Sequence, residues 1–256
     1  MKNNIPENEF LFSIKSFEAN KRQTISIPAL VSLLQEAAMQ NAANFGASVA
    51  NLQSIGVSWV LNRFRLNMHE YPRVEEEIMI KTYPVRMDKF FVIRDYLIYN
   101  RIHKLLGSAT SNWFVLDMVK RSMAPIPDFI REIQLPPIDE PQAPLEGKIR
   151  PPQQSDIFHE FKAHWHDLDF NLHVSNISYF RWLAESVPNG YLDSHELEEL
   201  DVTFKGECHN NDIIIAESQR FDEAGFAHRL LRAEDQKDLV WARSRWRPVP
   251  EILFPE

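Results

Sequence analysis

The chain has 256 residues, of which 44% are hydrophobic and 25% are charged. This length suffices for one large domain or for two small domains with their own cores, and the composition is typical of a globular protein. The formal net charge of -8 gives no global electrostatic support for nucleic-acid binding. These values favour a globular protein that does not bind nucleic acid.

Cysteine usage and the opening of the chain point to the cytoplasm. Cys208 is the single cysteine, so no intrachain disulfide can form, which suits a reducing compartment. The opening stretch MKNNIPENEF lacks the apolar core of a signal peptide. No apolar run approaches the roughly 20 residues that a membrane helix needs. We therefore expect a cytoplasmic protein without a membrane span.

The first half of the chain is predicted to form one long helix followed by an antiparallel meander. The helix covers residues 26–46, with Ser26 as a cap, Pro28 near the first turn and Gly46 as the stop. Five residues recur along it at helical spacing: Leu30, Leu34, Ala37, Asn41 and Phe45. The predicted strands are 57–68, 76–86, 90–99 and 106–117.

The second half repeats this order after a connector rich in proline and polar residues, 133–154. A helix is predicted within HVSNISYFRWLAESVPNG, ended by Pro188 and Gly190. One of its faces is apolar: Val174, Ile177, Ala184 and Val187. The predicted strands are 199–208, 212–221, 226–233 and 238–246.

A short motif supports an internal duplication. The pattern Ala-x-Ser-x-Trp occurs at 109–113 and again at 242–246, an offset of 133 residues, and proline follows each copy. Helix, strands and terminators recur in the same order in both halves. The pattern favours an α+β architecture in which each sheet wraps its own helix. An ordinary two-domain α+β protein with a chance match is the alternative.

Three polar residues precede the second helix in DLDFNLHVSN. Asp169, Asn171 and His173 are spaced two apart, so an extended segment would place them on one face. The histidine can exchange protons near neutral pH, the amide can fix its tautomer or donate to an oxyanion, and the carboxylate can orient a base or attack. A polar cluster here can also simply cap the helix, through Ser175 or Asn176.

A second candidate stretch, DVTFKGECHNND, contains Glu207 and Cys208. Neighbours on a regular strand point to opposite faces, so only one of the two would face a site. The structural alternatives are a buried thiol and a solvated strand-end carboxylate. A metal site is a rival hypothesis, but the spacing is not a common zinc pattern; its ligands would be His164, His166, His173, Asp167 and Asp169. No Gly-x-Ser-x-Gly elbow of a serine hydrolase occurs.

The chain resembles the acyl-acyl carrier protein thioesterases of plants and bacteria. Their motif Asp-x-Asn-x-His-Val-x-Asn-x-x-Tyr is matched here by Asp169, Asn171, His173, Val174, Asn176 and Tyr179, and their Glu-Cys pair by Glu207 and Cys208. Further matches run in order through most of the chain: SIPALVSLLQEAA, WVLNRFRL, RDYLI, ATSNW and ARSRWRP. Ser175 replaces an asparagine of the family, and we expect little effect because serine can still cap the helix.

The resemblance implies a tandem double hot-dog fold and hydrolysis of the thioester between a fatty acyl chain and carrier-bound phosphopantetheine. It implies an N-terminal hot-dog domain at 1–135 that binds the acyl chain, a linker at 136–154 and a C-terminal hot-dog domain at 155–256 with the catalytic residues. These would be Asp169, Asn171, His173 and Glu207. An alternative scheme uses Cys208 as the nucleophile, although a buried thiol needs a nearby cation or dipole to become a thiolate. No metal or organic cofactor is expected.

The substrate would be a fatty acyl chain on acyl carrier protein. Candidate walls of its apolar tunnel are small or apolar residues of the first half: Leu33, Leu34, Ala37, Ala38, Trp59 and Phe90. The carrier is acidic, so a local basic patch would have to receive it; candidates are Arg63, Arg65, Lys120, Arg121, Arg181, Arg243, Arg245 and Arg247. A homodimer is one option for the oligomeric state.

Two other functions fit the same resemblance. One is a hot-dog acyl-CoA thioesterase or dehydratase, because CoA would also use basic residues. The other is a protein that binds acyl thioesters without cleaving them, which should tolerate changes at Asp169 and His173. The intact set of acid, amide, histidine and second acid favours the hydrolase.

Overall fold

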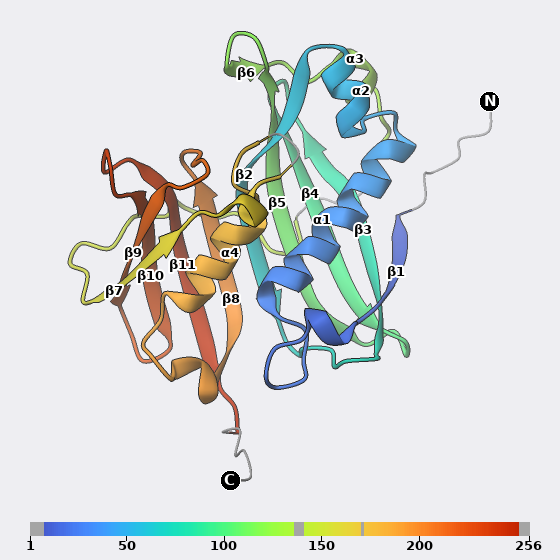
Figure 1. Cartoon of the computed structure of the whole chain (residues 1–256). Helices are drawn as coiled ribbons and strands as arrows, with labels where there is room; N and C mark the ends of the chain where they lie inside the picture. Colours follow the sequence, from blue (N-terminus) through green and yellow to red (C-terminus); the bar gives the residue numbers. More distant parts are fainter. Residues whose placement is uncertain (1–7, 136–140, 170–171, 251–256) are drawn as a thin grey trace. The chain divides into compact units, whose positions relative to one another are not determined.

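A computed structural model describes residues 8–135, 141–169 and 172–250 of the chain (Figure 1). The chain divides into two compact units. Unit 1 contains residues up to 19, 23–25 and 32–145; unit 2 contains 20–22, 26–31 and 146 onward. The predicted boundaries at 135 and 155 remain a prediction.

Unit 1 is built on a long helix and an antiparallel sheet. Its strands are β1 (Glu9–Ser13), β2 (Val57–Met68), β3 (Glu77–Met87), β4 (Phe91–Asn100), β5 (Leu105–Asp117) and β6 (Ser122–Ala124). Its helical elements are the 3-10 turn η1 (Ser16–Glu18), most of α1 (Ile27–Asn44), α2 (Val49–Ser54) and α3 (Asp128–Arg131). The sheet has the order β1-β3-β4-β5-β2, and β6 pairs with β5.

Unit 2 has the same arrangement of a long helix on an antiparallel sheet, with fewer additional short elements. Its strands are β7 (Ile157–Lys162), β8 (His195–Phe204), β9 (Ile213–Arg220), β10 (Gly225–Arg232) and β11 (Asp238–Pro248). Its helical elements are η2 (Trp165–Asp167), α4 (Asn176–Glu185) and η3 (Tyr191–Asp193). The strand order, β8-β11-β10-β9-β7, corresponds strand for strand to β2-β5-β4-β3-β1 of unit 1. The predicted duplication of helix and sheet is therefore confirmed.

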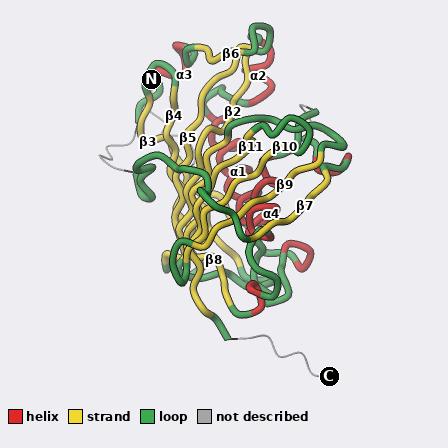
Figure 2. The backbone as a smooth tube through the Cα atoms, turned by 90° about the vertical axis from the view of Figure 1, so that its left-hand side faces the viewer, coloured by secondary structure: helices red, strands yellow, loops and turns green. Residues whose placement is uncertain are grey.

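Each long helix packs on the sheet of its own unit (Figure 2). In unit 1, Leu34 and Ala37 are completely buried, and a guanidinium nitrogen of Arg94 on β4 donates to Oδ1 of Asn41 on α1 at 2.7 Å. In unit 2, the rings of Tyr179 and Phe180 on α4 pack edge-on against Phe204 at the end of β8. Apolar burial of these faces stabilises both units. The fold is the predicted α+β tandem double hot-dog.

The two long helices and most of the predicted strands are confirmed, but other elements differ from the prediction. The sheets contain the edge strands β1 and β7, which the sequence analysis did not predict. The predicted strand 199–208 is displaced, because β8 covers His195–Phe204. Glu207 and Cys208 consequently lie in a loop, and the strand-parity argument applied to them is wrong.

Candidate active site

Two members of the predicted polar triplet, Asp169 and His173, lie in a tight turn rather than in an extended segment. Leu168 and Val174 form an isolated antiparallel bridge. Between them, the N–H of Asp169 donates to the carbonyl of His173 at 2.8 Å, and Leu172 is left-handed with φ of 64°. A left-handed leucine is uncommon and is held only by surrounding contacts. The prediction of an extended segment is wrong. The two-residue spacing of these side chains in the sequence therefore does not determine which of them converge.

The turn nevertheless brings Asp169 and His173 together. The N–H of His173 lies 3.4 Å from Oδ1 of Asp169. Asn171, the third member of the predicted triplet, lies outside the described residues, so its role remains a prediction. Asp169 and His173 are both half-buried. They are therefore accessible to a small reactant while being held by the protein.

Glu207 faces the histidine across the site. Its Oε2 lies 3.6 Å from Nε2 of His173, and the side chains are 41% and 28% exposed, respectively. The contact arises because Val174, next to the histidine, donates its N–H to the carbonyl of Cys208 at 3.1 Å. The pair can exchange a proton, and the carboxylate can stabilise an imidazolium.

Helix α4 begins directly after the turn. Ser175 is its N-cap, and the Ser175 Oγ accepts the N–H of Ile177 at 3.3 Å. The predicted cap is confirmed. The N-terminus of this helix carries a partial positive charge, which favours negative charge developing nearby.

Cys208 is buried and hydrogen-bonded away from solvent. Tyr179 of α4 donates its hydroxyl to the Cys208 Sγ at 3.2 Å and accepts the Cys208 N–H at 3.0 Å. Burial raises the pKa of the Cys208 thiol to about 11. The thiol is therefore protonated near neutral pH, which favours a structural role over a nucleophilic one.

Sequence reasoning missed His209, whose ring packs edge-on against His173 with centroids 5.6 Å apart. Its adjacency to Glu207 and Cys208 was the only available signal. Among the residues that the structure describes, no group of three or more His, Cys, Asp or Glu side chains is arranged to hold a metal.

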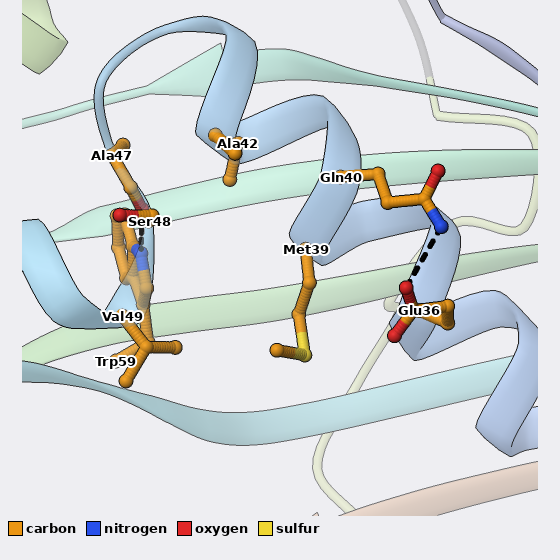
Figure 3. A pocket seen from close by; sticks show the side chains of 9 residues that line it. Glu36, Met39, Gln40, Ala42, Ala47, Ser48, Val49 and Trp59 are labelled. Atoms are coloured by element: carbon orange, nitrogen blue, oxygen red, sulfur yellow. Dashed lines mark hydrogen bonds between the residues drawn. The ribbon is translucent and has the colours of Figure 1, made fainter.

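A pocket of about 260 Å³ lies in unit 1 at the C-terminal half of α1 (Figure 3). Its walls are the helix, the start of α2 and β2. They comprise Glu36, Met39, Gln40, Ala42, Ala43, Ala47, Ser48, Val49 and Trp59. The indole of Trp59 donates to the carbonyl of Ala47 at 3.1 Å, which fixes one wall. The lining is mainly apolar, as expected for a site that binds an apolar ligand.

Only one of the predicted wall residues, Trp59, lines this pocket. Leu34, Ala37 and Ala38 are buried, and Leu33 is half-buried. Phe90 is half-buried at the β3–β4 turn, where its N–H donates to Asp88 Oδ1. The pocket residues that the sequence analysis missed are spread over helix and loop, where no periodic pattern identifies them.

Several of the basic residues considered for carrier docking already have partners. The guanidinium groups of Arg63 and Arg65 donate to the carbonyls of Leu145 and Pro144. Other basic candidates form ion pairs with acidic side chains: Lys120–Asp117, Arg181–Asp167, Arg245–Asp222 and Arg247–Glu196. Arg243 lies over the ring of Phe221, 4.3 Å from its centroid. The arginines of β11 thus belong mostly to a paired outer face, and the docking surface is not assigned to them.

Two family models cover most of the chain. The N-terminal domain of acyl-ACP thioesterases matches residues 8–134, and the C-terminal domain matches residues 150–248. With the duplicated helix-and-sheet fold, these matches define a double hot-dog protein of the thioesterase class. The chain belongs to the acyl-ACP thioesterase family.

Similar proteins come from plants and bacteria. A chloroplastic palmitoyl-acyl carrier protein thioesterase of Cuphea hookeriana is 28% identical over 94% of this chain, which spans only 62% of that protein's length. A chloroplastic oleoyl-acyl carrier protein thioesterase of Arabidopsis thaliana is 24% identical, with coverage of 92% and 75%. The chain thus spans less than two thirds of the first of these relatives.

Solved structures show the same fold. An acyl-ACP thioesterase from Bacteroides thetaiotaomicron superposes with a TM-score of 0.81 at 18% identity, covering 93% of this chain and 97% of its own. A 12:0-ACP thioesterase from Umbellularia californica gives 0.81 at 21% identity, covering 94% and 97%. At these identities the likeness establishes the fold alone.

Proposed function

We propose that this chain hydrolyses the thioester of a fatty acyl-acyl carrier protein and releases a free fatty acid and holo-carrier protein in fatty acid biosynthesis. The observation that carries the proposal is the convergence of Asp169, His173 and Glu207 in unit 2. Family membership supports it, and the named relatives act on acyl carrier protein substrates.

In the proposed reaction, a water oxygen bonds to the thioester carbonyl carbon while His173 accepts a proton from that water. Glu207 helps to activate the water and stabilises the imidazolium. The C–S bond then breaks, and the leaving thiolate takes the proton from His173. Asp169 orients this system, and Asn171 positions the histidine. In the alternative scheme, the Asp169 carboxylate attacks the carbonyl carbon, the C–S bond breaks, and water then hydrolyses the resulting acyl anhydride to release the fatty acid and regenerate Asp169. The positive end of α4 stabilises the oxyanion.

We further propose a division of labour between the units. Unit 1 would bind part of the acyl chain in the pocket beside Trp59, whose apolar walls suit a hydrocarbon. Unit 2 would supply the catalytic residues. None of the helices in the described ranges has the length and hydropathy of a membrane span. A cytoplasmic location and a homodimer remain predictions.

The test is turnover of acyl-carrier substrates from short to long chains, beside matched acyl-CoAs, by wild type and His173→Ala. Faster hydrolysis of carrier substrates, lost in the variant, is the expected result. A preference for acyl-CoA would instead support the alternative thioesterase. Binding without turnover of any thioester by folded wild type would contradict the hydrolase and support an acyl-thioester binding protein.

A further inference from the structure

The turn that carries the candidate catalytic residues has a structural counterpart in the first half of the chain. In unit 2, the bridge joins Leu168 and Val174; in unit 1, an equivalent bridge joins Ala19 and Ile25. A left-handed residue lies two positions before the end of each bridge, Leu172 with φ of 64° and Gln23 with φ of 61°. A 3-10 turn precedes both copies, η2 and η1.

The segments whose carbonyls accept a hydrogen bond from these turns also correspond. Val174 donates its N–H to the carbonyl of Cys208 at 3.1 Å, and Ile25 donates to Pro72 at 2.9 Å. A carboxylate closes each accepting loop. Asp212 Oδ2 accepts the His209 N–H, Glu76 Oε2 accepts the Arg73 N–H, and both distances are 2.9 Å. The backbone frame is therefore the same in both copies.

The two copies differ in their chemistry. Asn20 and Thr24 stand where the second copy has Asp169 and His173, and Tyr71 stands where it has Glu207. The frame thus forms without the candidate catalytic side chains. A structural feature that occurs only in the second copy is therefore a candidate for a role in catalysis.

One such feature is the carboxylate at the end of the 3-10 turn. In the first copy, Glu18 is half-buried and accepts only a local hydrogen bond among the described residues, from the N–H of Lys15 at 2.7 Å. In the second copy, Asp167 accepts the corresponding N–H of His164 at 2.8 Å and is only 7% exposed at its side chain. The local cap is shared, but the burial is not.

Asp167 is also tied to α4 by two contacts that Glu18 lacks. Its Oδ1 accepts the Ser178 hydroxyl at 3.0 Å and a guanidinium N–H of Arg181 at 2.7 Å. Burial alone would raise the pKa of the Asp167 carboxyl, but these donors and the His164 N–H lower it below its usual value. Ala29 and Ser32 occupy the equivalent helix positions in the first copy, and neither side chain carries a guanidinium.

We propose that Asp167, through Ser178 and Arg181, is a positioning residue that clamps the catalytic turn to the first turns of α4. Its carbonyl also accepts the N–H of Ser175 at 2.8 Å, so the same residue holds both ends of the turn. Asp169 and His173 lie between these fixed points. Holding reacting groups in place lowers the barrier because small displacements are costly in rate.

The clamp is tested by kinetics of the full chain with acyl-carrier substrate, and it rests on the proposed function. Asp167→Asn should lower kcat by about 10- to 100-fold and leave KM within about twofold. The matched control, Glu18→Gln, removes the equivalent carboxylate from the other copy and should leave both constants unchanged. All rates are measured well below the melting temperature of each variant.

A second substitution separates clamping from simple capping of the turn. Glutamate caps the equivalent turn in the first copy, so Asp167→Glu should preserve the local hydrogen bond while displacing the carboxylate from Ser178 and Arg181. A clamp predicts that kcat stays low in this variant. Recovery of wild-type kcat would show that the residue only caps the turn, and would overturn the proposal.

Should Asp167→Asn fail to fold, Ser178→Ala and Arg181→Lys test the same clamp. Each should lower kcat, and their effects should not be additive because both act through one carboxylate. Unchanged kcat in both would contradict the proposal. Failure of the proposed function gives a distinct result, since wild type itself would then show no turnover.

Discussion

At the scale of single residues, the assignment of chemistry depends on the environments of Cys208 and Glu207. The Cys208 thiol is buried and hydrogen-bonded to Tyr179, and its pKa is raised to about 11. The carboxylate is partly exposed and lies 3.6 Å from the His173 ring. A thiol at that pKa is almost entirely protonated at pH 7 and is a poor nucleophile.

Replacing the thiol should therefore spare the reaction. Cys208→Ala is expected to keep kcat/KM within about tenfold of wild type, since it removes a small buried group rather than a reactive one. The measurement is steady-state hydrolysis of an acyl-carrier substrate at pH 7. A loss of more than about a thousandfold in a folded variant would return Cys208 to the role of nucleophile.

The sequence pointed to the residues of the candidate site but not to the geometry that joins them. Motif resemblance selected His173 and Glu207, and the structure brings them together. The left-handed Leu172 and the buried Asp167 could not be predicted, because each depends on contacts with residues distant in the chain or on α4. Leucine gives no local signal for a positive φ.

At the scale of elements, a buried polar group links the sheet of unit 2 to α4. His228 on β10 is completely buried, and its ring nitrogens contact the hydroxyl groups of Ser186, Ser218 and Ser244 at 2.7 to 3.0 Å. Burial lowers the pKa of His228 to about 3. The imidazole is therefore neutral in the folded protein at all ordinary pH values.

This histidine should make stability depend on pH. Because its folded pKa lies below its unfolded value near 6.5, the unfolded chain binds the additional proton, and stability falls as pH drops below about 6.5. Between pH 7 and pH 5 the free energy of unfolding should fall by about 2 kcal/mol from this group. Denaturant unfolding of wild type and His228→Gln at both pH values measures the difference.

The comparison isolates the buried histidine because all carboxylates are shared by the two proteins. His228→Gln should be less stable than wild type at pH 7 but should lose less stability on acidification. His166→Gln, at an exposed position, is the matched control and should retain the wild-type slope. Parallel slopes for wild type and His228→Gln would contradict a neutral buried imidazole.

Element prediction succeeded where periodicity was long and failed at edges. The long helices and the inner strands followed from repeated apolar spacing and from proline and glycine stops. β1 and β7 were missed because short edge strands have few alternating residues. The start of β8 was missed because residues 195–198 contain a single apolar residue, Leu197. Glu196 is nevertheless paired with Arg247 across the sheet.

At the scale of the whole molecule, the duplication would allow one chain to assign acyl binding and catalysis to different units, as we propose. Both halves of the chain repeat the same sheet order and the same turn, yet only the second copy holds the acid–histidine–acid set. The architecture was predictable because the halves repeat in sequence order. The pocket was not, since its walls come from a helix, a loop and a strand.

Narrowing the pocket should change the preferred acyl length. Ala42→Leu adds bulk to a half-buried wall position, so kcat/KM for long acyl-carrier substrates should fall by about tenfold relative to short ones. Ala50→Leu, at an exposed site on α2, is the matched control. An unchanged ratio of long to short substrates would show that this pocket does not hold the acyl chain.

The central claim is that a carboxylate and a histidine cleave the thioester, and Glu207→Gln tests it most directly. The amide keeps the size of the side chain but removes its charge and basicity. We predict that kcat on an acyl-carrier substrate falls by about 10²- to 10⁴-fold, while Glu234→Gln, at an exposed position in the β10–β11 turn, retains wild-type activity. Wild-type kcat in a folded Glu207→Gln protein would contradict the account.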